Sequence, residues 1–220
     1  MSWFKFLGSG AVGPFSGYRW PAPERGDGPG EWVEEARRLE PCRVGLHVCR
    51  PGDLPFWLFE ELYAVEVDGP VVEHDGFALA RRARLLRRVD AWDQDAASRF
   101  SRDCAWRVRD LAARALRESG RGQDADRLVD CTTIAGLGRA AGRVAGDGVG
   151  GGPLVGYAVD AATFASAAGR EPQWAAPAVT SAFVAATAAR VAGGPDDGDA
   201  ALSAERARQG RWLVDHVLAL

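Results

Sequence analysis

The densest group of chemically versatile side chains is the motif Cys42-x4-His47-x-Cys49. Cysteine and histidine are the ligands that zinc prefers, and a thiolate beside an imidazole is also the pairing of a catalytic nucleophile with its base. Zinc needs four protein ligands, or three and a water, and no second Cys-x2-Cys pair completes the motif. We therefore expect neither a metal nor another cofactor, and favour a histidine packed or hydrogen-bonded on a strand.

A second motif, Gly136-Leu-Gly138-Arg-Ala-Ala141, matches the glycine spacing of a dinucleotide fingerprint, and Asp160 follows at a distance suited to a ribose hydroxyl. The fingerprint requires a buried strand before its first glycine, but residues 128–135 include an aspartate and two threonines. The apolar residues around the motif recur at helical spacing instead. This favours glycines that allow two helices to pack closely.

Five arginines lie between residues 81 and 88, and guanidinium groups bind phosphate through paired donors. The near-neutral net charge favours a simpler interpretation, in which these arginines pair with surface glutamates. Under an enzyme hypothesis the group would hold a phosphate, with His47 as a polar anchor and Glu66 as acid or base. The residues assigned to that site are His47 and Glu66 as catalytic groups and Arg81, Arg84, Arg87 and Trp57 as binding groups.

The strands and helices that position these residues are predicted from two different spacings of the apolar residues. In the N-terminal part, the aromatic run at 2–7 and the alternation at 43–49 and 62–67 predict strands. Asp68-Gly69-Pro70 predicts a turn after the last of these. Residues 77–89 fit both a helix and a strand, and we interpret them as a strand, which gives a small, mostly antiparallel sheet.

After residue 90 the apolar residues recur every three or four positions, as in amphipathic helices. Ser119-Gly120 predicts the end of the first helix, Asp199 predicts the start of the last, and Phe183 is expected to be a large anchor in an otherwise alanine-rich bundle. The expected helices cover residues 90–118, 123–145, 153–169, 173–191 and 200–218.

These patterns predict an α+β fold with an α/β sheet domain over residues 1–90 and a helical bundle over residues 91–220. A chain of 220 residues, 47% of them hydrophobic, is long enough to bury a substantial core. The formal net charge of -3 gives no reason to expect a nucleic acid or an anionic membrane as partner.

The expected location is the cytoplasm. The opening segment lacks the apolar core of a signal peptide, and four cysteines in a chain of ordinary core size do not resemble a small disulfide-stapled scaffold. Residues 175–189 are apolar but end at Arg190, short of the ~20 residues that a membrane span needs. We therefore expect a core helix there.

Four segments carry a resemblance to an uncharacterised group of actinobacterial proteins. They are Val44-Gly-Leu-His-Val-Cys49, Asp53-Leu-Pro-Phe-Trp57, Leu62-Tyr-Ala-Val-Glu-Val-Asp-Gly69 and Arg84-Leu-Leu-Arg-Arg-Val89. The same part of the chain, about residues 3–100, is distantly similar to phage and bacterial domains of unknown function with a Gly-Phe/Leu-His-x-Cys strand. The resemblance implies a strand at 77–89 and no particular activity.

A separate likeness connects the helical part to alanine-rich immunity proteins of bacterial polymorphic toxin systems. It is carried by repeated Ala-Ala pairs, such as Ala161-Ala162 and Ala188-Ala189, although the histidines usual in such helices are missing. Neighbouring residues do not assemble an acid, a base and a nucleophile with any specificity. We therefore expect a non-catalytic module that binds another protein, with an enzyme of the ADP-ribosyl-transfer type, acting on a nucleotide-like or phosphorylated substrate, as the alternative.

Overall fold

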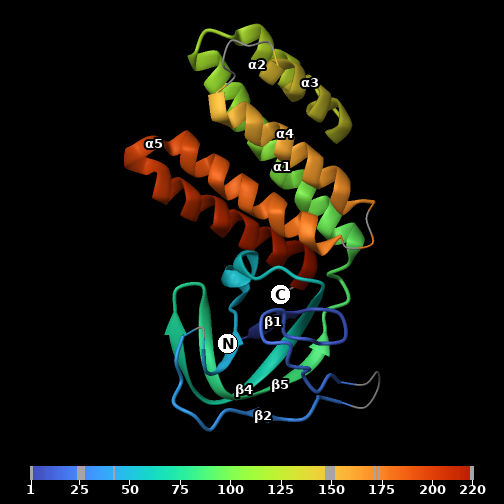
Figure 1. The fold of residues 1–220 in the computed structure, drawn as a ribbon, viewed down its shortest axis with the longest axis vertical. Helices are drawn as coiled ribbons and strands as arrows, with labels where there is room; N and C mark the ends of the chain where they lie inside the picture. Colours follow the sequence, from blue (N-terminus) through green and yellow to red (C-terminus); the bar gives the residue numbers. More distant parts are fainter. Residues whose placement is uncertain are drawn as a thin grey trace. The chain divides into compact units, whose positions relative to one another are not determined.

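The computed structural model describes residues 2–23, 28–41, 43–146, 152–170, 172 and 174–218. A small antiparallel sheet comes first in the chain and helices follow, so the predicted α+β class is confirmed (Figure 1). The chain forms two compact units, one made of Met1–Asp93 with Gly210–Leu220 and the other of Gln94–Gln209. The last turns of the chain therefore belong to the same unit as the sheet.

The sheet has five strands, and all of their pairings are antiparallel. The strand order is β1-β4-β5-β2, and β3 pairs with another part of β5. The strands are β1 (Trp3–Leu7), β2 (Val33–Glu34), β3 (Leu46–Val48), β4 (Glu61–His74) and β5 (Phe77–Arg88). The strands predicted at 2–7, 43–49 and 77–89 are thus present, the second in a shorter form.

The sheet closes on itself through Phe4 and Cys49. The backbone of Cys49, directly after β3, donates to the Phe4 carbonyl at 2.8 Å, and the Phe4 N–H donates to the Cys49 carbonyl at 2.9 Å. Because β3 also pairs with β5, the strands β1, β4, β5 and β3 form a continuous ring of backbone pairing. The Phe4–Cys49 bridge joins the edges of β1 and β3 and encloses the space inside the curved strands, while β2 remains an edge strand.

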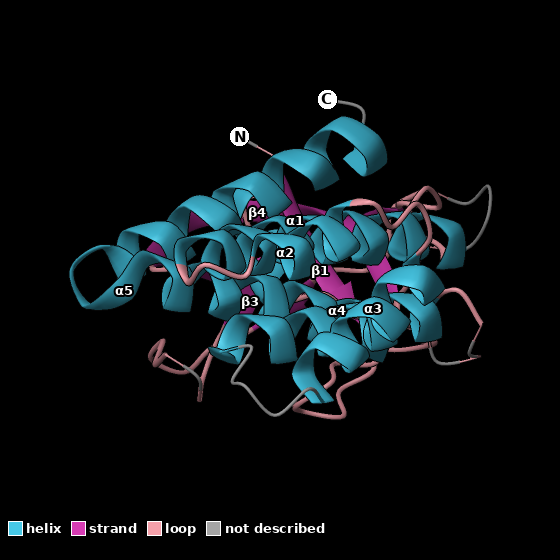
Figure 2. Cartoon of the chain, turned by 90° about the horizontal axis from the view of Figure 1, so that it is seen from above, coloured by secondary structure: helices cyan, strands magenta, loops and turns pink. Residues whose placement is uncertain are grey.

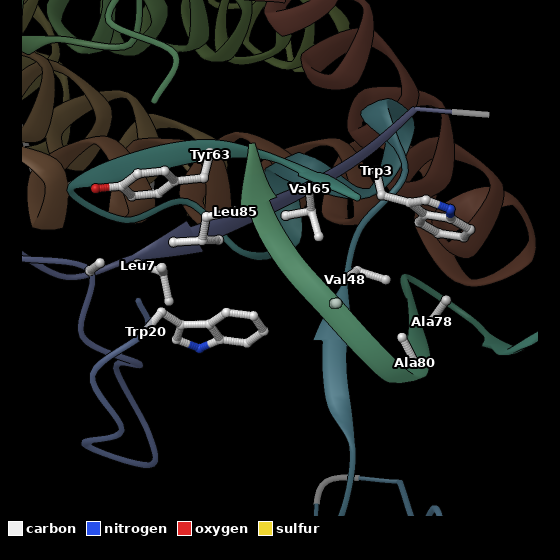
Figure 3. Packing of buried hydrophobic residues seen from close by; sticks show 11 residues of the cluster. Trp3, Leu7, Trp20, Val48, Tyr63, Val65, Ala78, Ala80 and Leu85 are labelled. Carbon is white, nitrogen blue, oxygen red and sulfur yellow. The ribbon is translucent and has the colours of Figure 1, made fainter. Parts of the chain in front are cut away.

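That enclosed space holds the core of the sheet unit. In Figure 3 the side chains of Leu7, Trp20 and Leu85 point toward one another, although they come from β1, a loop and β5. Tyr63 and Trp3 belong to the same buried cluster. Burying each such large apolar side chain contributes roughly 1.5–3 kcal/mol, so this cluster is the main source of cohesion in the sheet.

The predicted turn at Asp68-Gly69-Pro70 is wrong, because β4 continues through it to His74. Asp68 pairs with Arg82 and Val71 pairs with Ala80, so three steps along β4 match two along β5. The extra residue makes a β-bulge, which accommodates both the positive φ of Gly69 (84°) and the missing N–H of Pro70. The chain reverses instead at Asp75-Gly76, where Gly76 has a φ of 79°.

The helical unit begins with α1, whose end was predicted correctly. Gly120 has a φ of 78° and the Arg121 N–H donates to the Leu116 carbonyl at 2.8 Å, which is a glycine-based stop. The single helix predicted at 123–145 is wrong, because Thr133 caps a new helix by accepting a hydrogen bond from the Gly136 N–H at 3.1 Å. The helices are α1 (Gln94–Glu118), α2 (Gly122–Val129), α3 (Ile134–Gly146), α4 (Gly152–Ala168) and α5 (Ala175–Leu213).

The element α5 consists of two helical arms that lie side by side (Figure 1). Gly194, with φ 68° and ψ -167°, breaks the helix, and Pro195 starts the second arm. Asp199 lies inside that arm and pairs with Arg190 at 3.0 Å, so its predicted role as a cap is wrong. Phe183 is 61% exposed, so it is not the bundle anchor that we expected, and alanines form most of the buried face of the first arm.

The stretch Ala175–Leu218 is the one helical segment, among the described residues, that is long and apolar enough to cross a membrane. Of its most apolar 18-residue window, 56% is buried inside the protein. Buried helices of folded domains have the same length and composition, so this segment alone does not locate the protein. A π-helical turn over Val214–Leu218 follows α5 and belongs to the sheet unit, where Gly210 contacts the backbone of Gly52.

Candidate functional site

A cluster of aromatic rings lies on one face of the sheet, beside the turn that joins β4 to β5. The Phe77 ring is 5.2 Å from the ring of His47, 5.8 Å from that of Trp57 and 4.9 Å from that of His74. The His74 and Phe77 rings are stacked, with 22° between their planes. Contacts at these distances contribute packing energy beyond simple burial.

Strand register explains why these rings share a face. His47 on β3 is paired with Leu79 on β5, which is paired in turn with Val72 on β4, and Phe77 is paired with His74. Residues paired across antiparallel strands point to the same side, as do residues two apart on one strand. Leu79, between His47 and Val72 in this row, is completely buried.

Trp57 reaches this face from the short 3-10 helix η1 (Pro51–Phe56). The helix begins with Pro51 and carries Pro55 inside it, which fixes φ at both positions. Trp57 follows it directly and donates its indole Nε1–H to the Gly76 carbonyl at 2.6 Å. This bond ties η1 to the β4–β5 turn and holds the indole against Phe77.

Two apolar side chains on this face remain open to solvent. Phe56 is 49% exposed and lies next to Gly76, and Val72 is 47% exposed at the β4 end of the row that starts at His47. We call the set the hairpin patch. Its members are His47, Phe56, Trp57, Val72, His74 and Phe77.

The surroundings of His47 favour the uncharged form of its ring. Burial is the main cause that lowers its pKa, the Lys5 ammonium and His74 lower the pKa further, and a hydrogen bond with the Gly45 backbone partly opposes them. The His47 carbonyl accepts a hydrogen bond from Lys5 Nζ at 2.7 Å, which fixes β3 against β1. A neutral imidazole is able to accept a proton, and it also loses little solvation energy when a partner covers it.

Glu66, the second residue predicted as catalytic, lies elsewhere. It is paired with Arg84 across β4 and β5, and its carboxylate accepts from Arg84 Nε at 2.7 Å and Nη2 at 2.6 Å. Leu79, the partner of His47, is five residues from Arg84 along β5. At about 3.3 Å per residue this separates the His47 and Glu66 positions by roughly 16 Å, too far for one reacting atom.

The predicted phosphate-binding arginines do not converge either. Arg84 is held by Glu66 and stacks on Trp32, with the guanidinium carbon 4.5 Å from the ring centre. Arg81 donates to the Arg37 carbonyl at 3.3 Å, while Arg87 is exposed opposite Ala64. The expectation that sheet arginines pair with acidic residues is confirmed for Arg84, and Arg82 likewise pairs with Asp68 and Glu34.

The cysteines show no arrangement for metal or redox chemistry in the described part of the chain. Cys42 falls outside the described residues, so the Cys42–His47 relationship is not placed. Cys49 and Cys104 are buried free thiols, and burial raises the pKa of each to about 12, which keeps them protonated. Among the described residues, no three His, Cys, Asp or Glu side chains are grouped so that they could hold a metal ion.

Sequence reasoning found His47 and Trp57 but missed Phe56, Val72, His74 and Phe77. Their spacing carried a partial signal, because His74 and Phe77 flank a two-residue Asp-Gly turn and are therefore paired. We missed that signal because the turn was predicted seven residues too early. The exposure of Phe56 and Val72 depends on what packs around them, which periodicity does not contain.

Comparisons of the chain with protein-family models, with curated proteins and with solved structures find no match. The function is therefore argued from the residues of the hairpin patch and from their surroundings.

Proposed function

We propose that this protein is a non-catalytic interaction module that binds another protein through the hairpin patch. The observation that carries the proposal is the exposure of Phe56 and Val72, at 49% and 47%, beside the tightly packed rings of Trp57 and Phe77. Aromatic side chains are enriched at the centres of protein interfaces, where they supply most of the binding energy. Exposed apolar side chains that lie together mark binding surfaces more reliably than exposed apolar side chains scattered singly over a protein.

Rigidity of the patch supports the same proposal. Trp57 is fixed by its hydrogen bond to Gly76, and Leu79, the strand partner of both His47 and Val72, is completely buried. A surface that is already ordered loses little conformational entropy when a partner binds. The neutral state of His47 adds to this, because no buried charge would need a partner in the complex.

Charged residues beside the patch suit a polar rim. Asp75 is exposed in the turn that bounds the patch, and the neighbouring Glu73 forms an ion pair with Arg50 on the opposite face of β4. Interfaces commonly surround an aromatic centre with polar groups that stay partly hydrated. With the net charge of -3, this arrangement favours a protein in the cytoplasm as partner over a nucleic acid or a membrane.

The proposal is tested by capture from the bacterial cytoplasm with three immobilised forms of the full chain. These are the wild type, the double variant Phe56→Ser/Val72→Ser, and Phe15→Ser. Phe15 is a matched control, because it is 89% exposed in the same unit but lies outside the patch. We expect the wild type and Phe15→Ser to capture a protein that the double variant does not capture. The free energy of unfolding of the double variant should change by only about 0.5 kcal/mol per substitution.

Equal capture by all three forms would overturn the proposal, provided that thermal unfolding shows all three to be folded. The alternative is an enzyme of the ADP-ribosyl-transfer type that uses neutral His47 on a nucleotide-like or phosphorylated substrate. A thermal-shift screen against nucleotides tests it, since a ligand at 100 times its dissociation constant adds ~2.7 kcal/mol of stability. Stabilisation that is lost on His47→Ala but retained on Phe56→Ser would favour the enzyme.

A further inference from the structure

The helical unit contains a pocket of about 290 Å³ between α3 and α4. The two helices lie beside each other in both views (Figures 1 and 2), and the pocket is lined by the first residues of α3 and the second half of α4. Its volume is near the lower limit for small-molecule sites, which are typically ~300–1,000 Å³. A ligand that fits must therefore be small.

Close packing of the helices makes the floor of this pocket apolar and shallow. A Cβ atom on Gly138 would lie 3.5 Å from the Ala162 methyl group, so only small side chains separate the helix backbones here. The glycine motif that resembles a dinucleotide fingerprint is helical, and its second glycine serves this contact. The interpretation as a helix contact is thus confirmed for Gly138, whereas Gly136 lies against Thr133 at the start of α3.

Two arginines give the pocket its charge. Arg139 comes from α3 and Arg170 follows α4, and both line the pocket. None of the described residues that line it is acidic, and within the described part of the chain neither arginine has a carboxylate at ion-pair distance. Some other arginines of the unit do form ion pairs, as Arg117 does with Asp126 and Arg127 with Asp124.

The remaining polar groups also favour an anion. Arg170 uses Nε to donate to the Ser166 carbonyl at 3.1 Å, which orients its guanidinium group over the pocket residues. The Thr163 hydroxyl donates its hydrogen bond to the Val159 carbonyl at 2.9 Å. Ser166 therefore has the pocket hydroxyl that can donate to a ligand. Ile134, the first residue of α3, lines the same pocket and adds the positive end of a helix dipole.

We propose that this pocket binds a small phosphate-bearing molecule, with Arg139 and Arg170 holding the phosphate and the Gly138–Ala162 floor receiving a compact apolar body. Two guanidinium groups from different segments match a dianionic phosphate with three free oxygens, whereas a carboxylate has one charge and two oxygens. The site is in the unit that does not contain the hairpin patch, so this inference is independent of the proposed function.

The test is a titration of the full ¹⁵N-labelled chain with phenyl phosphate, followed by NMR, with benzoate and inorganic phosphate as comparison ligands. We expect saturable shifts confined to residues 134–139 and 162–170, and tighter binding of phenyl phosphate than of either comparison ligand. Arg139→Gln and Arg170→Gln should each weaken binding by about tenfold, since each removes a charge-assisted hydrogen bond.

Arg143→Gln is the matched control, because Arg143 is an exposed arginine one turn beyond Arg139 on α3 and does not line the pocket. Its affinity for phenyl phosphate should equal that of the wild type. Three results would overturn the proposal. They are a dissociation constant for phenyl phosphate above about 10 mM, an equal affinity for benzoate, or an equal loss of phenyl phosphate affinity in Arg143→Gln and Arg139→Gln. Unchanged amide spectra of the ligand-free variants establish that each is folded.

Discussion

The ammonium group of Lys5 lies 4.9 Å from the ring centre of Trp20, inside the curved sheet. Lys5 is the only lysine in the chain, and it also donates to the His47 carbonyl. A cation over an indole ring is stabilised by the ring's electron density, but burial still removes water from the charge. Desolvation lowers the pKa of Lys5 from 10.5 to about 8, with the nearby Cys49 acting in the opposite direction.

This depressed pKa predicts a specific pH dependence of stability. Between about pH 8 and pH 10.5 the unfolded chain binds more protons at Lys5 than the folded chain does, so the contribution of Lys5 to the free energy of unfolding rises with pH. Lys5→Met removes this charge. We expect the free energy of unfolding of Lys5→Met, minus that of the wild type, to be roughly 1–3 kcal/mol larger at pH 7 than at pH 10. Urea denaturation at both pH values measures this difference. Parallel stability curves for the two proteins would contradict it.

The buried ion pair of Arg107 and Glu205 joins α1 to the second arm of α5. Arg107 Nη2 and Nε donate to Glu205 Oε1 at 2.8 Å and 3.0 Å, and Gln209 Nε2 donates to the same oxygen at 3.0 Å. The two side chains are only 13% and 7% exposed. We expect Glu205→Ala to lower the free energy of unfolding by ~1–3 kcal/mol, since buried Arg107 loses the partner of its Nε and Nη2 while its ion pair with Asp103 remains.

The exposed pair of Arg117 and Asp126 provides the control for this prediction. Asp126→Ala removes an ion pair of the same chemistry and should cost less than ~1 kcal/mol, because water already screens both charges. Guanidinium chloride denaturation measures both variants. The account of Glu205 is wrong if the two substitutions have similar effects.

Glu61 organises the loop that follows β1. Its carboxylate accepts hydrogen bonds from the Ala11 N–H at 2.9 Å, the Gly10 N–H at 3.2 Å and the Tyr63 hydroxyl at 3.0 Å, and it pairs with Arg88. This set holds Ala11 at a φ of 59°, a conformation that alanine rarely adopts. We expect Glu61→Gln to cost ~1–3 kcal/mol, because one acceptor oxygen becomes a donor that faces other donors.

Its sequence neighbour Glu60 provides the comparison for Glu61. Glu60 accepts one exposed hydrogen bond, from the Ser9 N–H, so Glu60→Gln should change the free energy of unfolding by less than ~0.5 kcal/mol. Limited proteolysis of the loop over residues 8–20 reports the same effect locally. Faster cleavage in Glu60→Gln than in Glu61→Gln would be incompatible with this role for Glu61.

Two glycines of α3 differ in the space around them, so substitution should stabilise the protein at one position and destabilise it at the other. A Cβ on Gly142 meets no atom within 4 Å, so Gly142→Ala should stabilise the protein by ~0.5–1 kcal/mol through helix propensity alone. Gly138→Leu should instead destabilise it by ~1–3 kcal/mol, because the larger side chain would push α3 away from Ala162. Thermal unfolding monitored by circular dichroism separates the two. Stabilisation by Gly138→Leu would show that the helices are not in close contact there.

The sequence by itself determined that strands come first in the chain and helices follow, although the pattern at 77–89 fits both elements and β2 was not predicted. Alternation at 43–49 and repeats of three and four after residue 90 are local consequences of which side of an element faces a core, and they predicted β3 and α1 correctly. Gly120 likewise predicted the end of α1, because a positive φ is a property of one residue. The turn predicted at Asp68-Gly69-Pro70 is wrong, because the same residue types occur in turns and in β-bulges. Pairing with β5 makes this segment a bulge.

Only the tertiary structure decided how residues distant in the sequence meet. The closure of the sheet by Phe4 and Cys49 and the hairpin patch both depend on pairings between separate segments. His47 and Glu66 were candidates for one site on chemical grounds, and the register of β5 set them roughly 16 Å apart. Side-chain chemistry is local and can be recognised in a sequence. The distance between two side chains depends on the packing of the whole unit, and in this protein packing separated the predicted catalytic pair and brought four rings together instead.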